Sequence, residues 1–305
     1  MGRIGSLEVS PAGLGCNNFG RRIDQTRTKE VVDAALDVGV TTFDTADIYG
    51  DGKSEEFLGR ALGARRDGVV IVTKFGGGMQ GGGRPEYVRK ACDASLDRLG
   101  TDRIDVYLLH FPDSTTPVGE TLTAMNELAA EGKVREIGCS NFTAEQLDEA
   151  TAFAQSEGLR PFVTVQNEYS LVHRAPETTG VLEAAERLGM SFMPYFPLAS
   201  GALTGKYRRG QPAPGGTRLG REGGKPAEDV IQPERIDAVE RLIAFAESRG
   251  HTILELAMSW VASRTPVATV IAGATSPDQV RANTAALTAW PLTDDDLREI
   301  DSMTG

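Results

Sequence analysis

The stretch that decides the fold is residues 69–74, VVIVTK, a run of β-branched residues that ends in a lysine. A second run of the same kind, residues 104–110 (IDVYLLH), ends in a histidine. Both runs are largely apolar on both faces, as buried parallel strands tend to be. Because parallel strands present their carboxyl ends at one edge, we expect Lys74 and His110 to lie close together.

Similar apolar runs alternate with helical patterns along the rest of the chain. Capping-box pairs mark helix starts at Thr143, Thr252 and Ser276, and Pro85 opens another helix. The alternation has no composition break, which favours a single (β/α)8 barrel spanning residues 1–305 over a doubly wound sheet. Residues 163–165 with their flanks and residues 267–271 are further β-branched runs of the same kind. The weaker strand predictions, after an N-terminal β-hairpin at residues 3–9, are residues 12–16, 40–43, 134–138 and 191–195.

The amino-acid composition argues against two classes of binding partner. The net charge of −11, from 43 acidic and 32 basic residues, disfavours nucleic acid and anionic membrane surfaces. The sequence has neither an apolar run of membrane-span length nor an apolar core of signal-peptide length at its N-terminus, so we expect a cytoplasmic location. Three scattered cysteines suit a reducing compartment, and the three histidines lack metal-ligand spacing, so no metal site is expected.

The strand ends carry the candidate chemistry. Asp44 and Lys74 end neighbouring strands, and Tyr49 falls in the loop after Asp44. A structural ion pair between Asp44 and Lys74 is one interpretation. The other is a proton-transfer centre, in which the ammonium lowers the pKa of Tyr49 and Tyr49 protonates a carbonyl oxygen. His110 is a second hydrogen-bond donor to that oxygen.

One glycine motif is a decoy. Gly76, Gly78 and Gly81 match the spacing of a dinucleotide fingerprint, but more glycines, an arginine and Pro85 intervene before the helix begins. We interpret this segment as a loop at the pocket rim. The low-complexity residues 208–225 predict a flexible loop after strand seven, over the top of the barrel.

Residues 39–62 (GVTTFDTADIYGDGKSEEFLGRAL) and 132–142 (GKVREIGCSNF) resemble motifs of the aldo-keto reductases, and the resemblance runs from about Gly5 to the end of the chain. It implies a barrel that reduces aldehydes and ketones with NADPH, without a Rossmann domain, and a catalytic set of Asp44, Tyr49, Lys74 and His110. The cofactor-binding residues that it implies are Ser140, Asn141, Gln166, Tyr195, Phe196, Leu198, Ser200, Lys206, Gly273, Thr275, Ser276, Gln279 and Asn283.

Two positions depart from the family pattern. Phe196 stands where the family usually has a small residue, which predicts a reshaped pocket. Ser276 stands where many members place a basic residue against the 2′-phosphate of the cofactor. Arg281 is a partial replacement, so NADH remains an alternative to NADPH. An apolar substrate pocket, suited to a hydrophobic or aromatic carbonyl, is expected from Asn17, Phe19, Phe75 and Phe111.

Two other functions stay open. Some relatives of this shape act mainly as cofactor-binding regulatory subunits of ion channels, with slow turnover. A Schiff-base aldolase using Lys74 is a third interpretation, although it leaves Tyr49 unexplained. The sequence also leaves open whether the protein is a monomer or a homo-oligomer.

Overall fold

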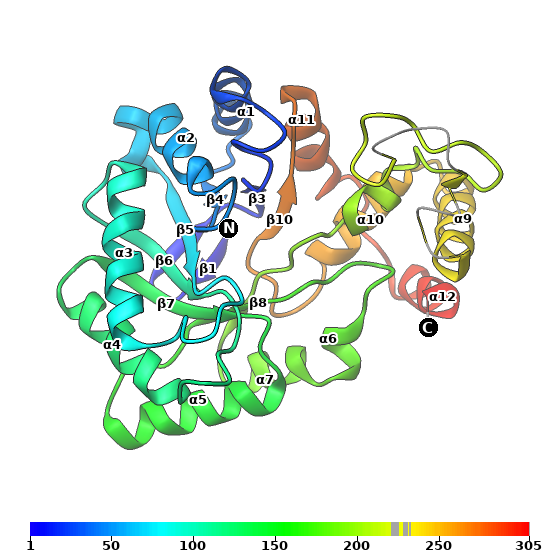
Figure 1. Ribbon diagram of the computed structural model, residues 1–305. Helices are drawn as coiled ribbons and strands as arrows, with labels where there is room; N and C mark the ends of the chain where they lie inside the picture. Colours follow the sequence, from blue (N-terminus) through cyan, green and yellow to red (C-terminus); the bar gives the residue numbers. More distant parts are fainter. Residues whose placement is uncertain (221–225, 228–230, 232, 305) are drawn as a thin grey trace.

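Eight parallel strands curl around a common axis, with helices on the outside (Figure 1). The computed structural model describes residues 1–220, 226–227, 231 and 233–304. Isolated bridges from Phe192 to Val267 and from Tyr195 to Ile271 join the last two strands, so the sheet closes on itself. The strands, in sheet order, are β10 (Val270–Gly273), β3 (Ala12–Gly15), β4 (Thr42–Asp44), β5 (Val70–Phe75), β6 (Ile104–Leu109), β7 (Val134–Ser140), β8 (Thr164–Gln166) and β9 (Ser191–Phe192). The predicted (β/α)8 barrel is confirmed.

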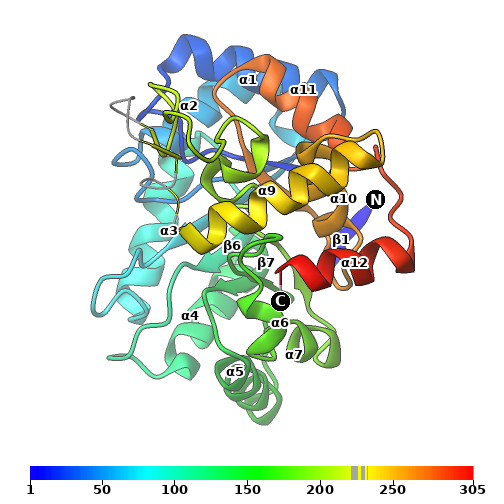
Figure 2. The same ribbon diagram turned by 90° about the vertical axis from the view of Figure 1, so that its right-hand side faces the viewer.

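Helices follow the strands and cover the sheet from outside. Figure 2 shows the face formed by α9, α10 and α12, where α12 contacts α9. Within the described ranges, no helix has the length and apolarity needed to cross a membrane. The helices are α1 (Gln25–Asp37), α2 (Lys53–Leu62), α3 (Pro85–Leu99), α4 (Val118–Ala130), α5 (Ala144–Glu157), α6 (Ala175–Thr178), α7 (Val181–Arg187), α9 (Pro233–Ser248), α10 (Ile253–Ala262), α11 (Pro277–Ala286) and α12 (Asp294–Thr304), with 3-10 turns η1 (Gly63–Gly68) and η2 (Ala199–Thr204).

The helix-start predictions are confirmed with one correction. Capping boxes form at Thr143 and at Thr252, and Pro85 is the first residue of α3. At α11, Ser276 accepts a hydrogen bond from the Gln279 backbone, but the Gln279 side chain accepts from Thr275 instead of closing the box. The first α-helix, α1, begins at Gln25, because Asp24 caps it by accepting a hydrogen bond from the Arg27 backbone.

The predicted N-terminal hairpin, β1 (Gly2–Ile4) and β2 (Leu7–Val9), packs against the barrel interior. Ile4, Leu7 and Val9 are buried there with inward side chains of β5 and β6, including Val72 and Val106. The interior is therefore filled with apolar side chains at this end, and only the opposite end is left for a ligand.

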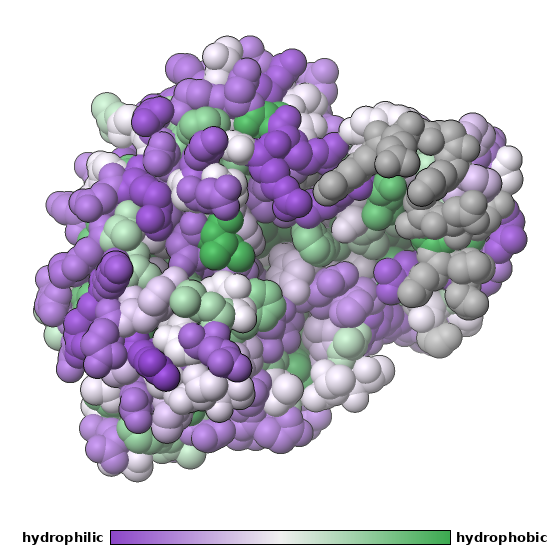
Figure 3. Space-filling model, viewed as in Figure 1, coloured by the Kyte–Doolittle hydropathy of each residue, from purple (hydrophilic) through white to green (hydrophobic). Residues whose placement is uncertain are grey.

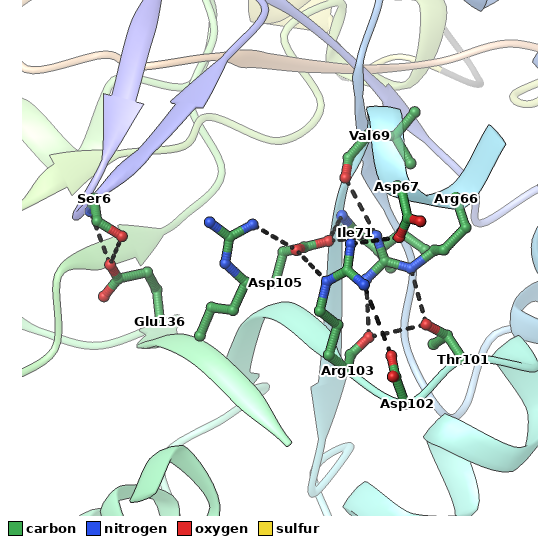
Figure 4. Close-up of polar contacts among 11 residues, drawn as sticks. Ser6, Arg66, Asp67, Val69, Ile71, Thr101, Asp102, Arg103, Asp105 and Glu136 are labelled. Atoms are coloured by element: carbon green, nitrogen blue, oxygen red, sulfur yellow. Dashed lines mark hydrogen bonds and ion pairs between the residues drawn. The ribbon is translucent and has the colours of Figure 1, made fainter. Parts of the chain in front are cut away.

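Ion pairs and hydrogen bonds of buried carboxylates connect the segments at the same end of the barrel (Figure 4). The fully buried carboxylate of Asp105 lies 2.8 Å from Arg66 and 3.2 Å from Arg135. Glu136 accepts hydrogen bonds from the backbone and hydroxyl of Ser6, at 2.8 and 2.6 Å, which fixes the hairpin turn. We interpret this cluster as structural, since barrel chemistry lies at the C-terminal ends of the strands.

Candidate active site

Strand alternation brings the predicted residues to the interior at the C-terminal end of the barrel. In β5, Val70 and Val72 belong to the interior cluster, so Lys74 points inward as well. In β6, Val106 and Leu108 point inward, and His110 follows with the same parity. The period of two along each strand therefore places these proton-carrying side chains on one surface.

Lys74 and Asp44 form a buried ion pair. The Lys74 ammonium lies 2.8 Å from each carboxylate oxygen of Asp44 and donates to the Thr45 carbonyl at 2.7 Å. Burial alone lowers the pKa of Lys74, but the charges and hydrogen bonds of Asp44 and Tyr49 outweigh it, so the pKa lies above its usual value. The lysine is therefore a fixed cation that faces the tyrosine.

Tyr49 lies beside this cation, with its ring centroid 5.1 Å from the Lys74 ammonium. Burial raises the pKa of Tyr49 more than Lys74 lowers it, so its net pKa lies above the usual value of a tyrosine. The expected net lowering is therefore wrong, because the phenol leaves water when it approaches the ammonium. The hydroxyl keeps its proton at neutral pH, as a proton donor requires.

His110 lies edge to face with Tyr49, with ring centroids 5.8 Å apart. Burial, together with the nearby Lys74 charge, lowers the pKa of His110 to about 3, so the imidazole is neutral. Its Nδ1 atom is buried and has no hydrogen-bond partner in the described part of the chain. The ring therefore offers its other nitrogen to the adjoining cavity.

A cavity of about 280 Å³ opens above these side chains, and Figure 3 shows the hollow in the surface. Asn17 and Phe111 line it as predicted. Phe19 and Phe75 do not: both are fully buried in the core, and Phe75 points outward because its neighbour Lys74 points inward. The lining residues are Gly15, Asn17, Asp44, Ile48, Tyr49, His110, Phe111, Ser140, Asn141, Gln166, Tyr195, Phe196, Arg218, Ile271 and Gly273.

One wall of the cavity is a network of amides and hydroxyls. Gln166 donates to Asp44 Oδ1 at 2.9 Å, and Ser140 donates to the Gln166 carbonyl at 2.7 Å. Asn141, in a left-handed conformation with φ of 62°, accepts from the Tyr195 hydroxyl at 2.8 Å. These residues of β7, β8 and the segment after β9 therefore form one connected surface, facing the predicted catalytic residues.

A second cavity of about 380 Å³ continues from the first as a groove. Arg22 and Arg218 line it although the sequence did not indicate them, whereas Ser276 only caps α11 and is absent from the lining. Of the predicted loop 208–225, residues 221–225 lie outside the described residues. The predicted cofactor residues that line this groove are Phe196, Leu198, Ser200, Lys206, Gly273, Thr275, Gln279 and Asn283.

The charged side chains that line the groove, Arg22, Lys206 and Arg218, are all basic. Burial and the nearby Arg22 charge lower the pKa of Lys206, as expected for two cations sharing a cavity. Arg22 donates to the Gly216 carbonyl at 2.9 Å. This hydrogen bond holds the chain segment that carries Arg218 beside the groove. Arg281, the predicted replacement for a basic residue, lies outside the lining and pairs with Asp278 on the surface.

Phe196 separates the two cavities and lines both. Its φ of 54° is a strained value for a bulky residue, and such strain concentrates at functional sites. The Arg218 guanidinium lies 4.6 Å from the centre of its ring. The bulk at this position therefore forms a partition between the two cavities.

A barrel with Asp, Tyr, Lys and His at its C-terminal mouth and a basic groove beside them defines the class of this protein. The family model "Aldo/keto reductase family" matches residues 11–304, so the chain belongs to that family. Membership supports an oxidoreductase activity on carbonyl compounds.

Individual relatives span nearly the whole chain. A probable voltage-gated potassium channel subunit beta of Oryza sativa subsp. japonica is 36% identical over 96% of this chain and 91% of its own length. The aldo-keto reductase YhdN of Bacillus subtilis is 33% identical over 97% and 90%. The L-glyceraldehyde 3-phosphate reductase of Escherichia coli (strain K12) is 30% identical over 97% and 89%.

Proposed function

We propose that the protein reduces aldehydes and ketones to alcohols with a nicotinamide coenzyme, and that Tyr49 is the general acid. The observation that carries this proposal is the convergence of Asp44, Tyr49 and His110 on one cavity, with Lys74 directly beneath. When bound, the coenzyme would supply hydride to the carbonyl carbon. The two electrons form the new C–H bond, and the oxygen takes one proton from the enzyme.

The protein's part in this reaction is to deliver that proton. Tyr49 keeps its proton because its pKa is raised, and the Lys74 ammonium stabilises the phenolate that remains after transfer. A neutral His110 carries one N–H. Because a buried orphan donor is rarer than a buried orphan acceptor, we infer that this proton is on Nε2 and is donated to the carbonyl oxygen.

The residues present fit a nicotinamide dinucleotide. Lys206, Arg22 and Arg218 offer positive charge to phosphates along the groove. The amides and hydroxyl of Ser140, Asn141 and Gln166 would offer hydrogen bonds to the carboxamide, and Tyr195, which lines the same cavity, would stack on the nicotinamide ring. The three cations favour NADPH over NADH, although Ser276 is not basic.

The mouth of the active-site cavity favours a substrate with an apolar body. Ile48 and Phe111 are exposed large hydrophobic residues, and both line this cavity. Phe196 lines its other side. An aldehyde or ketone whose carbonyl oxygen reaches Tyr49 therefore places its remaining carbon skeleton against apolar surface.

Two rival functions make different predictions. A Schiff-base aldolase needs an uncharged lysine, whereas Lys74 has a raised pKa and three fixed acceptors. A channel-type regulatory subunit is favoured by the name of the rice relative, and this role would use the same coenzyme site. Affinity purification from the host that recovers a stoichiometric membrane partner would support that second role.

The proposal is tested by coenzyme oxidation with a panel of aliphatic and aromatic aldehydes and ketones, using NADPH and NADH in parallel. We expect turnover with aldehydes and lower KM for apolar or aromatic substrates. Analysis of the product must show one alcohol formed per coenzyme oxidised. Tight coenzyme binding without turnover on any carbonyl would instead favour the regulatory role.

A further inference from the structure

A second buried polar cluster lies directly behind the turn that carries Tyr49. Glu55 of α2 is fully buried and pairs with Arg98 of α3 at 2.7 Å. It also accepts from the hydroxyl of Thr73, the residue before Lys74, at 2.5 Å. Asp47, two residues before Tyr49, extends towards this cluster and lies 3.5 Å from the Tyr87 hydroxyl of α3. The proposed reaction assigns no role to Asp47 or to Glu55.

The surroundings of Asp47 stabilise its ionised carboxylate poorly. Its Oδ1 atom is buried and has no hydrogen-bond partner within the described ranges. Burial, and next the negative charge of Glu55, raise the pKa of Asp47 to about 6. The Ile48 backbone N–H, the Arg98 charge and the Tyr87 hydroxyl oppose this shift only in part, and Tyr107 of β6 adds another buried hydroxyl nearby. A buried carboxyl whose pKa is raised next to a proposed catalytic residue is typical of functional sites.

Backbone hydrogen bonds couple Asp47 to the proposed catalytic residues. The Asp47 backbone donates to the carbonyl of Lys74 at 3.1 Å. The Tyr49 backbone donates to the Ala46 carbonyl at 3.1 Å, so Asp47 lies inside the turn that presents the phenol. The backbone of Asp47 therefore connects the turn that carries the Tyr49 phenol to the strand that carries the Lys74 ammonium.

We propose that Asp47 is a positioning residue through which pH controls the reductase: the neutral carboxyl seats the Tyr49 turn, and the carboxylate, repelled by Glu55, displaces it. This inference rests on the proposed reductase function. It predicts that activity falls as Asp47 ionises.

The pKa values of the proposed catalytic residues leave a pH range in which an effect of Asp47 ionisation on activity can be observed. His110 is neutral above a pKa of about 3, and the pKa values of Tyr49 and Lys74 are raised above their usual alkaline values. None of the three changes charge between about pH 5 and pH 8. A step in activity within that range therefore has to come from another group of the protein, the substrate or the coenzyme.

The test compares kcat/KM from about pH 4.5 to pH 8 for the wild type, Asp47→Asn and the control Asp51→Asn. Asp51 is an exposed carboxylate on the same loop, and its φ of 57° suits asparagine equally well. NADH is used as the coenzyme, because it lacks the 2′-phosphate, which itself titrates near pH 6. For the wild type and Asp51→Asn we expect a roughly fivefold fall centred near the Asp47 pKa, and for Asp47→Asn a flat profile.

An independent readout is the denaturant midpoint of unfolding. Because the folded-state pKa of Asp47 is raised from 3.8 to about 6, the wild-type midpoint should fall relative to that of Asp47→Asn as pH rises through this interval. A flat wild-type profile, or a step that persists in Asp47→Asn, would overturn the inference while leaving the reductase intact. If no carbonyl is reduced, the proposed function fails instead, and NMR titration of the Tyr49 ring then decides whether the turn moves with Asp47.

Discussion

The Lys74 ammonium lies 2.8 Å from both carboxylate oxygens of Asp44, and the side chains are only 1% and 5% exposed. Gln166 donates to the same carboxylate from the far side of the barrel mouth. The pair is thus both a structural ion pair and the support of the proposed acid, so the two interpretations of the sequence do not exclude each other.

Replacing one member of this ion pair should lower the free energy of unfolding more than replacing both. We expect Asp44→Asn and Lys74→Met each to lower the free energy of unfolding by about 3 kcal/mol, because each leaves a buried group without its partner. The double variant should lose less than the sum of the two. Chemical denaturation of all four proteins measures this coupling, and strict additivity would contradict it.

Because folded His110 stays neutral, the free energy of unfolding should depend on pH. An unfolded histidine takes up a proton below about 6.5, whereas folded His110 does so only near 3, so acidification through this interval favours the unfolded chain. Between about pH 7.5 and pH 4.5 the wild type should lose roughly 2 kcal/mol more than His110→Asn. Denaturation at both pH values checks this, and parallel losses would show that His110 is not held neutral.

Coenzyme affinity should depend on Lys206 and not on Arg281. Lys206 lines the groove, whereas Arg281 pairs with Asp278 on the surface. Lys206→Met should weaken NADPH binding by about tenfold, the size of one charge-assisted contact, and Arg281→Met should leave it within twofold. Fluorescence titration measures both. Equal effects of the two substitutions would indicate instead that the 2′-phosphate of NADPH binds at α11.

Phe196 should set the size of substrate that fits. Glycine at this position removes the partition between the two cavities and suits the positive φ of 54°. We expect Phe196→Gly to raise the ratio of kcat/KM for bulky over small aldehydes by about tenfold. The control Phe75→Leu alters the core outside the cavity, so it should lower stability and leave that ratio unchanged.

Much of the barrel was predictable because each strand carries its own local signal. The run 104–109 matches β6 at both ends, and the parity of Val70, Val72 and Lys74 sets which side chains enter the mouth. The same parity, applied consistently, excludes Phe75 from the pocket. Segment ends were less predictable: β10 begins at Val270 instead of Val267, because hydrogen bonding and not side-chain type ends a strand.

The remaining site features depend on tertiary contacts. The net pKa of Tyr49 depends on how much water reaches the phenol, which residue type does not reveal. Arg22 and Arg218 meet the groove through loops without periodicity, and the Arg22 contact with Gly216 joins segments distant in sequence. The one feature of the sequence that could have indicated Arg22 is its position in the loop after β3.

The central claim is that Tyr49 supplies the proton, and single-turnover reduction by Tyr49→Phe tests it most directly. Tyr107→Phe is the matched control, because that hydroxyl is buried and has no partner in the described chain. With coenzyme bound and a good aldehyde present, Tyr49→Phe should reduce substrate at least about a hundredfold more slowly, the usual contribution of a positioned acid, while Tyr107→Phe keeps wild-type rates. Equal single-turnover rates for Tyr49→Phe and the wild type would contradict the account.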